Sequence, residues 1–183
     1  MHHGTASVSE RPARPLIQRA GELLEAVLND SPGNYQALTL WAGLLHCRVR
    51  LMKGEETAHM VSDTVRRFEA AAQNGANPDA ILRGWGTALW ALAKCVDGEE
   101  SARLMREAKA KLLESESRVP KSAPYPLALI SAQTGDLEEC QRWLRASGEP
   151  GGHLSRGWVE TEEDFAPVRD TEWFRQLLAG QAG

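Results

Sequence analysis

The stretches "GEETA" (residues 54–58) and "GEESA" (residues 98–102) are nearly identical and lie 44 residues apart. The match needs no gaps and extends to both sides. The same shift pairs Leu38 with Leu82, Trp41 with Trp85, Ala42 with Gly86, Leu45 with Leu89 and Phe68 with Leu112. Matches of this kind at one fixed shift indicate an internal structural repeat.

Each copy predicts two helices joined by a turn. Apolar residues recur at helical spacing along the chain, and the alternating pattern of a strand is missing. Stretches rich in proline and glycine, such as "NDSPGN" and "RVPKSAP", end the helical segments. The sequence therefore predicts an all-α fold with no sheet. We expect helices at about Pro15–Asp30, Tyr35–Met52, Glu55–Asn74, Asp79–Val96, Glu99–Ser117, Tyr125–Thr134 and Leu137–Ala146.

The acidic pairs at the two turns have a structural explanation. Glu55, Glu56, Glu99 and Glu100 each fall in the first turn of a predicted helix, where the helix dipole favours a negative charge. Asp97 is placed to cap the free N–H groups of the helix that follows it. We therefore interpret these carboxylates as helix-start signals and not as catalytic pairs.

The chain continues with a shorter third unit and a distinct end segment. The stretch "YPLALISAQTGDLEECQRWLRAS" (residues 125–147) reads as a tighter hairpin. In "TEEDFAPVRDTEWFRQLLAG" (residues 161–180), Asp164 or Thr161 is expected to cap one short segment and Asp170 or Thr171 a last helix. The apolar residues of that helix would cover the open end of the stack, and Arg169 is expected to pair with a nearby acid.

These motifs resemble the tetratricopeptide repeat, in a bacterial form with repeats of about 44 residues and a closing module at the C-terminus. Pro126, Leu129 and Glu172 depart from the pattern of that closing module. The resemblance covers roughly Leu16–Ala179 and implies a right-handed superhelix, or solenoid, of helical hairpins. It divides the chain into a disordered leader (1–14), repeats (15–147) and a C-terminal loop with capping helices (148–183). Within the repeats we expect a partial unit at 15–32 and hairpins at 35–77, 79–119 and 124–147.

The array thus begins in the middle of a repeat. Either the first helix stands alone as a cap, or the sequence is part of a longer array.

Composition and motifs argue against nucleic-acid binding, membrane insertion and catalysis. The 183 residues carry a net charge of −4, so no basic face for nucleic acid is expected, and no apolar stretch is long enough for membrane insertion. The three cysteines show no disulfide or metal spacing, which suits the cytoplasm. No recognised catalytic, cofactor or metal motif is present. We therefore expect no enzyme activity, no cofactor and no metal.

Binding remains as the predicted function. If Ala42, Gly86 and Ala128 face partner helices, other positions on the same helices must line the concave groove. The predicted groove residues are Gln36, Thr39, Gly43, His46, Arg83, Thr87, Trp90, Tyr125, Ala132 and Gln133. We expect a scaffold or adaptor that binds a protein or peptide there. The alternatives are an inhibitory or immunity-type partner that blocks an enzyme, and an enzyme whose site is not recognised.

Overall fold

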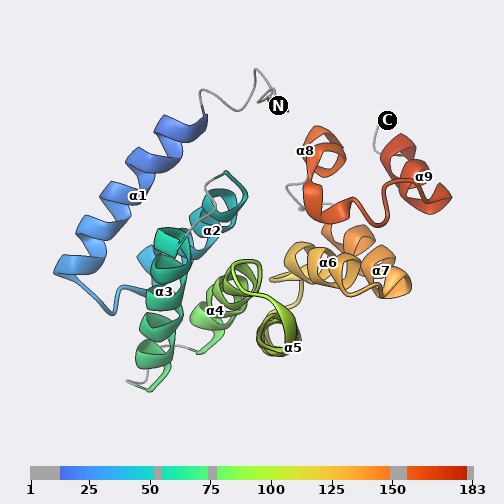
Figure 1. Cartoon of the computed structure of the whole chain (residues 1–183). Coiled ribbons are helices and arrows are strands. Elements are labelled where there is room, and N and C mark those ends of the chain that lie inside the picture. The colour runs from blue at the N-terminus through green and yellow to red at the C-terminus, as the bar shows by residue number, and fades with distance from the viewer. Residues whose placement is uncertain (1–12, 52–54, 74–77, 149–155, 181–183) are drawn as a thin grey trace. The chain divides into compact units, whose positions relative to one another are not determined.

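The computed structural model describes residues 13–51, 55–73, 78–148 and 156–180, and within these ranges the regular structure is helical, with no strand. The helices are α1 (Ala13–Asp30), α2 (Tyr35–Leu51), α3 (Glu55–Gln73), α4 (Pro78–Ala93), α5 (Gly98–Arg118), α6 (Pro124–Gln133), α7 (Leu137–Ser147), α8 (Arg156–Thr161) and α9 (Glu172–Gly180), with a 3₁₀ turn η1 (Glu163–Phe165). The predicted all-α class and the seven predicted helices are confirmed (Figure 1). The short α8 was not predicted, because its sequence follows a glycine-rich stretch and contains Gly157.

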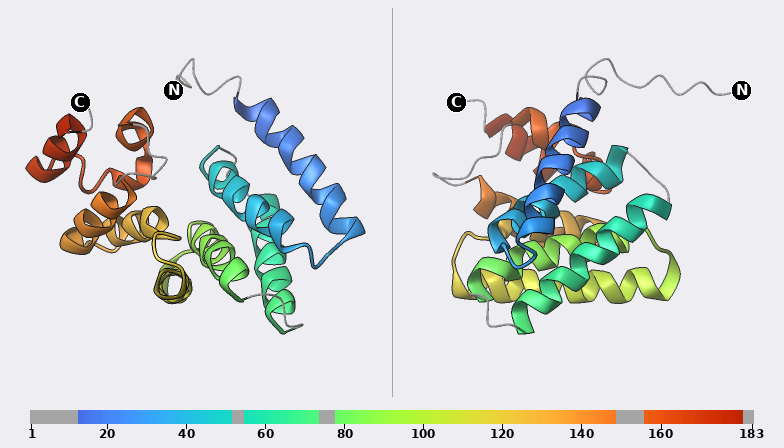
Figure 2. Two further views of the ribbon diagram at one scale, coloured as in Figure 1. Left: turned by 180° about the vertical axis from the view of Figure 1, so that it is seen from behind. Right: turned by 90° about the vertical axis from the view of Figure 1, so that its left-hand side faces the viewer.

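The chain forms two compact units, residues 1–108 and 109–183, and the boundary falls inside α5. In the first unit, α2 and α4 pack against each other and α3 packs against both. Helix α1 packs on α2 and lies at one edge of this unit in the left-hand view of Figure 2, and in the right-hand view it lies toward the viewer. Most of the predicted leader, residues 1–14, lies outside the described residues.

Burial follows the 44-residue repeat. Leu38 and its counterpart Leu82 are both buried, and so are Leu45 and Leu89. The same holds for Ala42 with Gly86 and for Phe68 with Leu112. Because corresponding positions face the core in both copies, the repeat in the sequence is also a repeat in the pattern of packing.

Neighbouring helices come very close at Gly84, a position that the sequence reasoning did not single out. A Cβ atom at Gly84 would lie 2.7 Å from Cζ of Phe68 and 3.2 Å from Oγ1 of Thr39. These two residues belong to α3 and α2, so three helices meet at this glycine. A side chain at this position would require the buried Phe68 ring to move.

In the second unit, α6 and α7 form a hairpin whose tight turn contains Gly135 at φ 79°, a value that favours glycine. Asp136 caps α7, since its side chain accepts a hydrogen bond from the Glu139 N–H at 3.0 Å.

Ala123 is the N-cap residue of α6, and its side chain makes no capping hydrogen bond. The backbone before α6 is held instead by Glu116, near the end of α5. Its carboxylate accepts hydrogen bonds from the N–H of Lys121 at 2.6 Å and from the N–H of Ala123 at 2.8 Å.

The C-terminal segment closes the second unit. Phe165 of this segment packs on two other rings. Its ring centroid lies 5.9 Å from that of Tyr125 on α6 and 5.7 Å from that of Phe174 on α9. The predicted cap of the short segment, Asp164 or Thr161, needs a correction: Glu162 caps η1 by accepting from the Asp164 N–H. Arg169 does not follow its prediction either, because it donates to the backbone carbonyl of Glu162 at 2.7 Å.

Candidate binding surface

Seven of the predicted groove residues lie on α2 and α4 in the first unit: Gln36, Thr39, Gly43 and His46 on α2, and Arg83, Thr87 and Trp90 on α4. Gln36 and Arg83 are exposed, and Thr39 and Thr87 are half-buried. The two threonine hydroxyls donate to carbonyls of their own helices, Thr39 to Tyr35 and Thr87 to Arg83, both at 2.8 Å.

These residues form one surface, which we call the α2–α4 face and define as Gln36, Thr39, Gly43, Arg83 and Thr87. The close approach of Thr39 to Gly84 joins the two helices along this face. The repeat relates its members, because the 44-residue shift places Thr39 on Arg83 and Gly43 on Thr87. Both copies therefore turn equivalent positions toward solvent.

Trp90 does not belong to this surface. Its side chain is 1% exposed, and Lys94 Nζ lies 5.0 Å from its ring centroid. The prediction that it faces outward was wrong because the exposed stripe of α4 is narrower than the repeat pattern suggested. Ala132 was also predicted to face outward and is buried. The side chain of His46 lies outside the described residues.

Two of the three predicted groove residues of the second unit, Tyr125 and Gln133, hold the C-terminal segment in place. The Tyr125 hydroxyl donates to Oε2 of Glu162 at 3.5 Å, and its ring packs edge-on against Phe165. Gln133 Nε2 donates to the backbone carbonyl of Asp164 at 2.9 Å. Because these groups already make contacts within the chain, we leave them out of the candidate surface.

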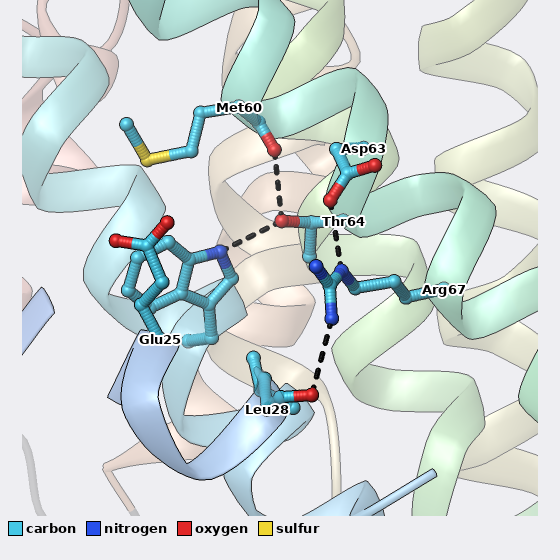
Figure 3. Close-up of a pocket in the computed structure, with 7 residues that line it drawn as sticks. Glu25, Leu28, Met60, Asp63, Thr64 and Arg67 are labelled. Carbon is cyan, nitrogen blue, oxygen red and sulfur yellow. Dashed lines mark hydrogen bonds and ion pairs between the residues drawn. The ribbon is translucent and has the colours of Figure 1, made fainter. Parts of the chain in front are cut away.

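A pocket of about 280 Å³ lies between α1, α2 and α3 in the first unit, lined by Glu25, Leu28, Trp41, Met60, Asp63, Thr64 and Arg67 (Figure 3). Its inner polar atoms bond to one another. Trp41 Nε1 donates to Thr64 Oγ1 at 2.7 Å, and that hydroxyl donates to the Met60 carbonyl at 2.9 Å. Thr64 therefore supplies the hydrogen-bond acceptor that the indole N–H of buried Trp41 needs.

The charged wall of the pocket attaches α1 to α3. Arg67 Nε donates to Oδ2 of Asp63 at 2.8 Å, and the same guanidinium reaches the Leu28 carbonyl near the end of α1 at 3.4 Å. The hydrogen bond from Arg67 lowers the pKa of Asp63, despite the opposing effect of burial, and Arg66 contributes to the lowering. The sequence reasoning missed this pair, although its i, i+4 spacing was a readable signal.

The thiols and carboxylates do not form an evident reaction centre. Burial raises the pKa of Cys140 to about 12, with a contribution from the charge of Asp136, and burial also raises that of Cys95. Such thiols carry little thiolate at neutral pH and are poor nucleophiles. Among the described residues, no group of three or more His, Cys, Asp and Glu side chains is arranged to hold a metal ion.

None of the helices in the described parts of the chain has the length and apolar character needed to cross a membrane. No protein-family model matches the chain, and comparison with curated proteins and with solved structures found no match either.

Proposed function

We propose that this protein is a non-catalytic, cytoplasmic scaffold or adaptor of the tetratricopeptide type, which binds a protein or peptide along the α2–α4 face. One observation carries the proposal. The two copies of the repeat bury corresponding residues and leave corresponding residues at least partly exposed on adjacent helices, as half-buried Thr39 and exposed Arg83 illustrate. Stacked repeats with a common outward stripe supply the extended surfaces that solenoid proteins use for binding.

The packing of the first unit supports the tetratricopeptide assignment. The first helices of successive hairpins, α2 and α4, lie against each other, and α3 packs into the angle between them. Cys95 and Cys140 are free thiols, which suits a reducing compartment. These features agree with the proposed right-handed superhelix and with the cytoplasm.

The chemistry of the face suggests the class of partner. Arg83 presents a guanidinium, Gln36 presents an amide, and the two threonines add hydroxyl oxygens. A guanidinium binds carboxylates in a two-pronged geometry and is frequent among residues that dominate binding energy. We therefore infer that the partner segment offers carboxylates or backbone carbonyls to the α2–α4 face.

Arg83→Glu tests the proposal, with Arg106→Glu as the matched control. Arg106 is also exposed in the first unit but lies on α5, outside the α2–α4 face. Proteins retained by the wild-type chain from a cell extract are identified by mass spectrometry, and their affinities are measured with purified components. The expected result is a partner whose affinity falls by about tenfold or more with Arg83→Glu and stays unchanged with Arg106→Glu. Equal losses with both variants, at unchanged stability, would contradict a role for this face.

A further inference from the structure

Helix α1 carries two parallel apolar stripes, of which only one is covered. The first stripe consists of Ile17, Gly21, Leu24 and Leu28 and turns toward the rest of the unit, with Leu28 only 3% exposed. The second consists of Leu16, Ala20, Leu23 and Val27. Its large side chains are 71%, 57% and 41% exposed for Leu16, Leu23 and Val27. We call this second set the outer stripe.

The outer stripe has the spacing of a helix–helix seam. Its members are separated by four, three and four residues, which is the a/d spacing of paired helices. Exposed leucines that occur singly need no explanation, but apolar side chains aligned along one helix indicate a surface that another element covers.

The charges on α1 indicate what that element is. Arg14 and Arg19 lie in the first half of the helix, and Glu22, Glu25 and Asp30 lie in the second half. This order is the reverse of what the helix dipole favours, since the first turn contains no acid and the last turn no base. The stability of α1 alone therefore does not account for its charge pattern.

An identical helix in antiparallel orientation would account for both features. It would bring the basic half of each copy beside the acidic half of the other, and the two dipoles would oppose each other. A parallel copy would place like charges side by side. A membrane surface fits less well, because membrane-bound amphipathic helices carry a polar face rich in Lys and Arg.

We propose that two copies of this chain associate through the outer stripes of α1, antiparallel about a two-fold axis that passes between Ala20 and Leu23. Leu16 of each copy packs on Val27 of the other, and Ala20 packs on Leu23. A two-fold axis makes such a contact self-complementary.

The charges nearest the axis fit the same geometry. Arg19 and Glu22 form an exposed pair within each helix, with NH1 and Oε2 2.9 Å apart. At a rise of about 1.5 Å per residue, Arg19 of one copy lies within one helical turn of Glu22 of the other. The seam is short, so we expect a reversible dimer with a Kd on the order of micromolar.

Analytical ultracentrifugation of the full chain tests the association. Between about 1 and 200 µM, the mass is expected to rise from one chain toward two. Leu23→Lys is expected to weaken the dimer by at least about tenfold, because it puts a charge into the seam. The matched control is Leu137→Lys, which makes the same change at a side chain 41% exposed on α7 and should leave the dimer unchanged. Circular dichroism confirms that both variants are folded.

A charge exchange tests the antiparallel arrangement. Arg19→Glu and Glu22→Arg, each alone, are expected to weaken the dimer by severalfold, and an equimolar mixture of the two should associate nearly as well as the wild type. A change in the stability of the helix within each chain cannot produce this rescue.

Three results would overturn the proposal. The first is a wild-type chain that stays monomeric over the whole concentration range, whether or not it binds vesicles that contain anionic lipid. The second is a Leu23→Lys variant that dimerises as well as the wild type. The third is an equimolar mixture of Arg19→Glu and Glu22→Arg chains that associates no better than either variant alone.

Discussion

The first and last helices of the described chain, α1 and α9, differ in how far the rest of their unit covers their apolar side chains. Both carry apolar side chains at helical spacing. In α9, Phe174 is fully buried and Leu178 is 8% exposed, whereas in α1 Leu16 is 71% exposed. The difference lies in what each unit supplies. Phe165 precedes α9 by a short loop and packs on Phe174, but the described part of the first unit places no side chains over the outer stripe. Apolar spacing therefore predicts that a helix has a face to cover, without saying whether its own chain covers it.

The strongest test of this contrast removes the anchor of α9. Phe174→Ala deletes a fully buried ring that contacts Phe165 and Trp173, so the free energy of unfolding should fall by about 3–5 kcal/mol. Urea denaturation followed by circular dichroism measures the change. A loss below about 1 kcal/mol would mean that the C-terminal segment does not depend on this ring.

A second test compares the ion pairs of the two units. The side chain of Glu139 is 13% exposed and accepts hydrogen bonds from Lys109 and from Ser131 Oγ, the latter at 2.9 Å. Burial would raise its pKa, but the hydrogen bonds from Lys109 and Ser131, together with the charge of Lys109, outweigh this effect and lower it.

Because the folded pKa of Glu139 lies below the unfolded value of 4.5, this pair stabilises the protein fully above that pH, and the stabilisation is lost as the pH falls through the folded pKa. Glu139→Gln should cost about 1–3 kcal/mol at neutral pH and should reduce the loss of stability on acidification. Asp63→Asn, at a side chain 48% exposed, should cost under about 1 kcal/mol. Urea denaturation at a series of pH values measures both, and equal acid sensitivity of wild type and Glu139→Gln would refute the assignment.

A third test uses two glycines of the first unit, Gly84 at a close contact between helices and Gly43 on the exposed face. Gly84→Ala pushes a Cβ against the buried Phe68 ring and should destabilise by about 1–2 kcal/mol, even after the gain in helix propensity. Gly43→Ala has nothing within 4 Å of its new Cβ and should stabilise by up to about 1 kcal/mol. Thermal unfolding compares the two variants. Changes of the same sign would show that the contact at Gly84 adjusts without cost.

The smallest effect is expected at the outer stripe of α1. Leu23→Ser removes an exposed side chain, so the free energy of unfolding at low protein concentration should change by no more than about 0.5 kcal/mol. Leu178→Ser, the comparable change on α9, should cost several times more because that side chain is 8% exposed. Urea denaturation at submicromolar concentration makes the comparison, and a large effect of Leu23→Ser there would show that α1 is packed more deeply.

Much of the fold could be predicted from the sequence, because helices follow from the spacing of apolar residues and from the stops supplied by proline and glycine. The positions that the repeat matches, Leu38 with Leu82 and Leu45 with Leu89, are indeed buried in both copies. It did not predict that Trp90 is buried or that the tight contact is at Gly84 and not at a repeat-matched position. Both depend on how neighbouring helices are rotated about their axes, which periodicity within one helix does not determine.

The candidate surface was predicted less completely for the same reason. Residues near the middle of the exposed stripe, such as Gln36 and Arg83, were placed outward correctly. Tyr125 and Gln133 were assigned to a groove, whereas they hold η1 through contacts that span more than thirty residues of sequence. Contacts at that separation leave no periodic signal in a single sequence.

The Glu116 carboxylate has a consequence for the order in which the chain folds. Because the N-cap residue Ala123 has no capping side chain, the entry to α6 is held by Glu116: the N–H groups of Lys121 and Ala123, just before the helix, find this acceptor only when the end of α5 is helical. The loop that must close is short, so the entropic cost is small once α5 has formed. Nucleation of α6 is therefore conditional on α5, and since α5 belongs to both compact units, fraying of its last turn would loosen the start of the hairpin that follows.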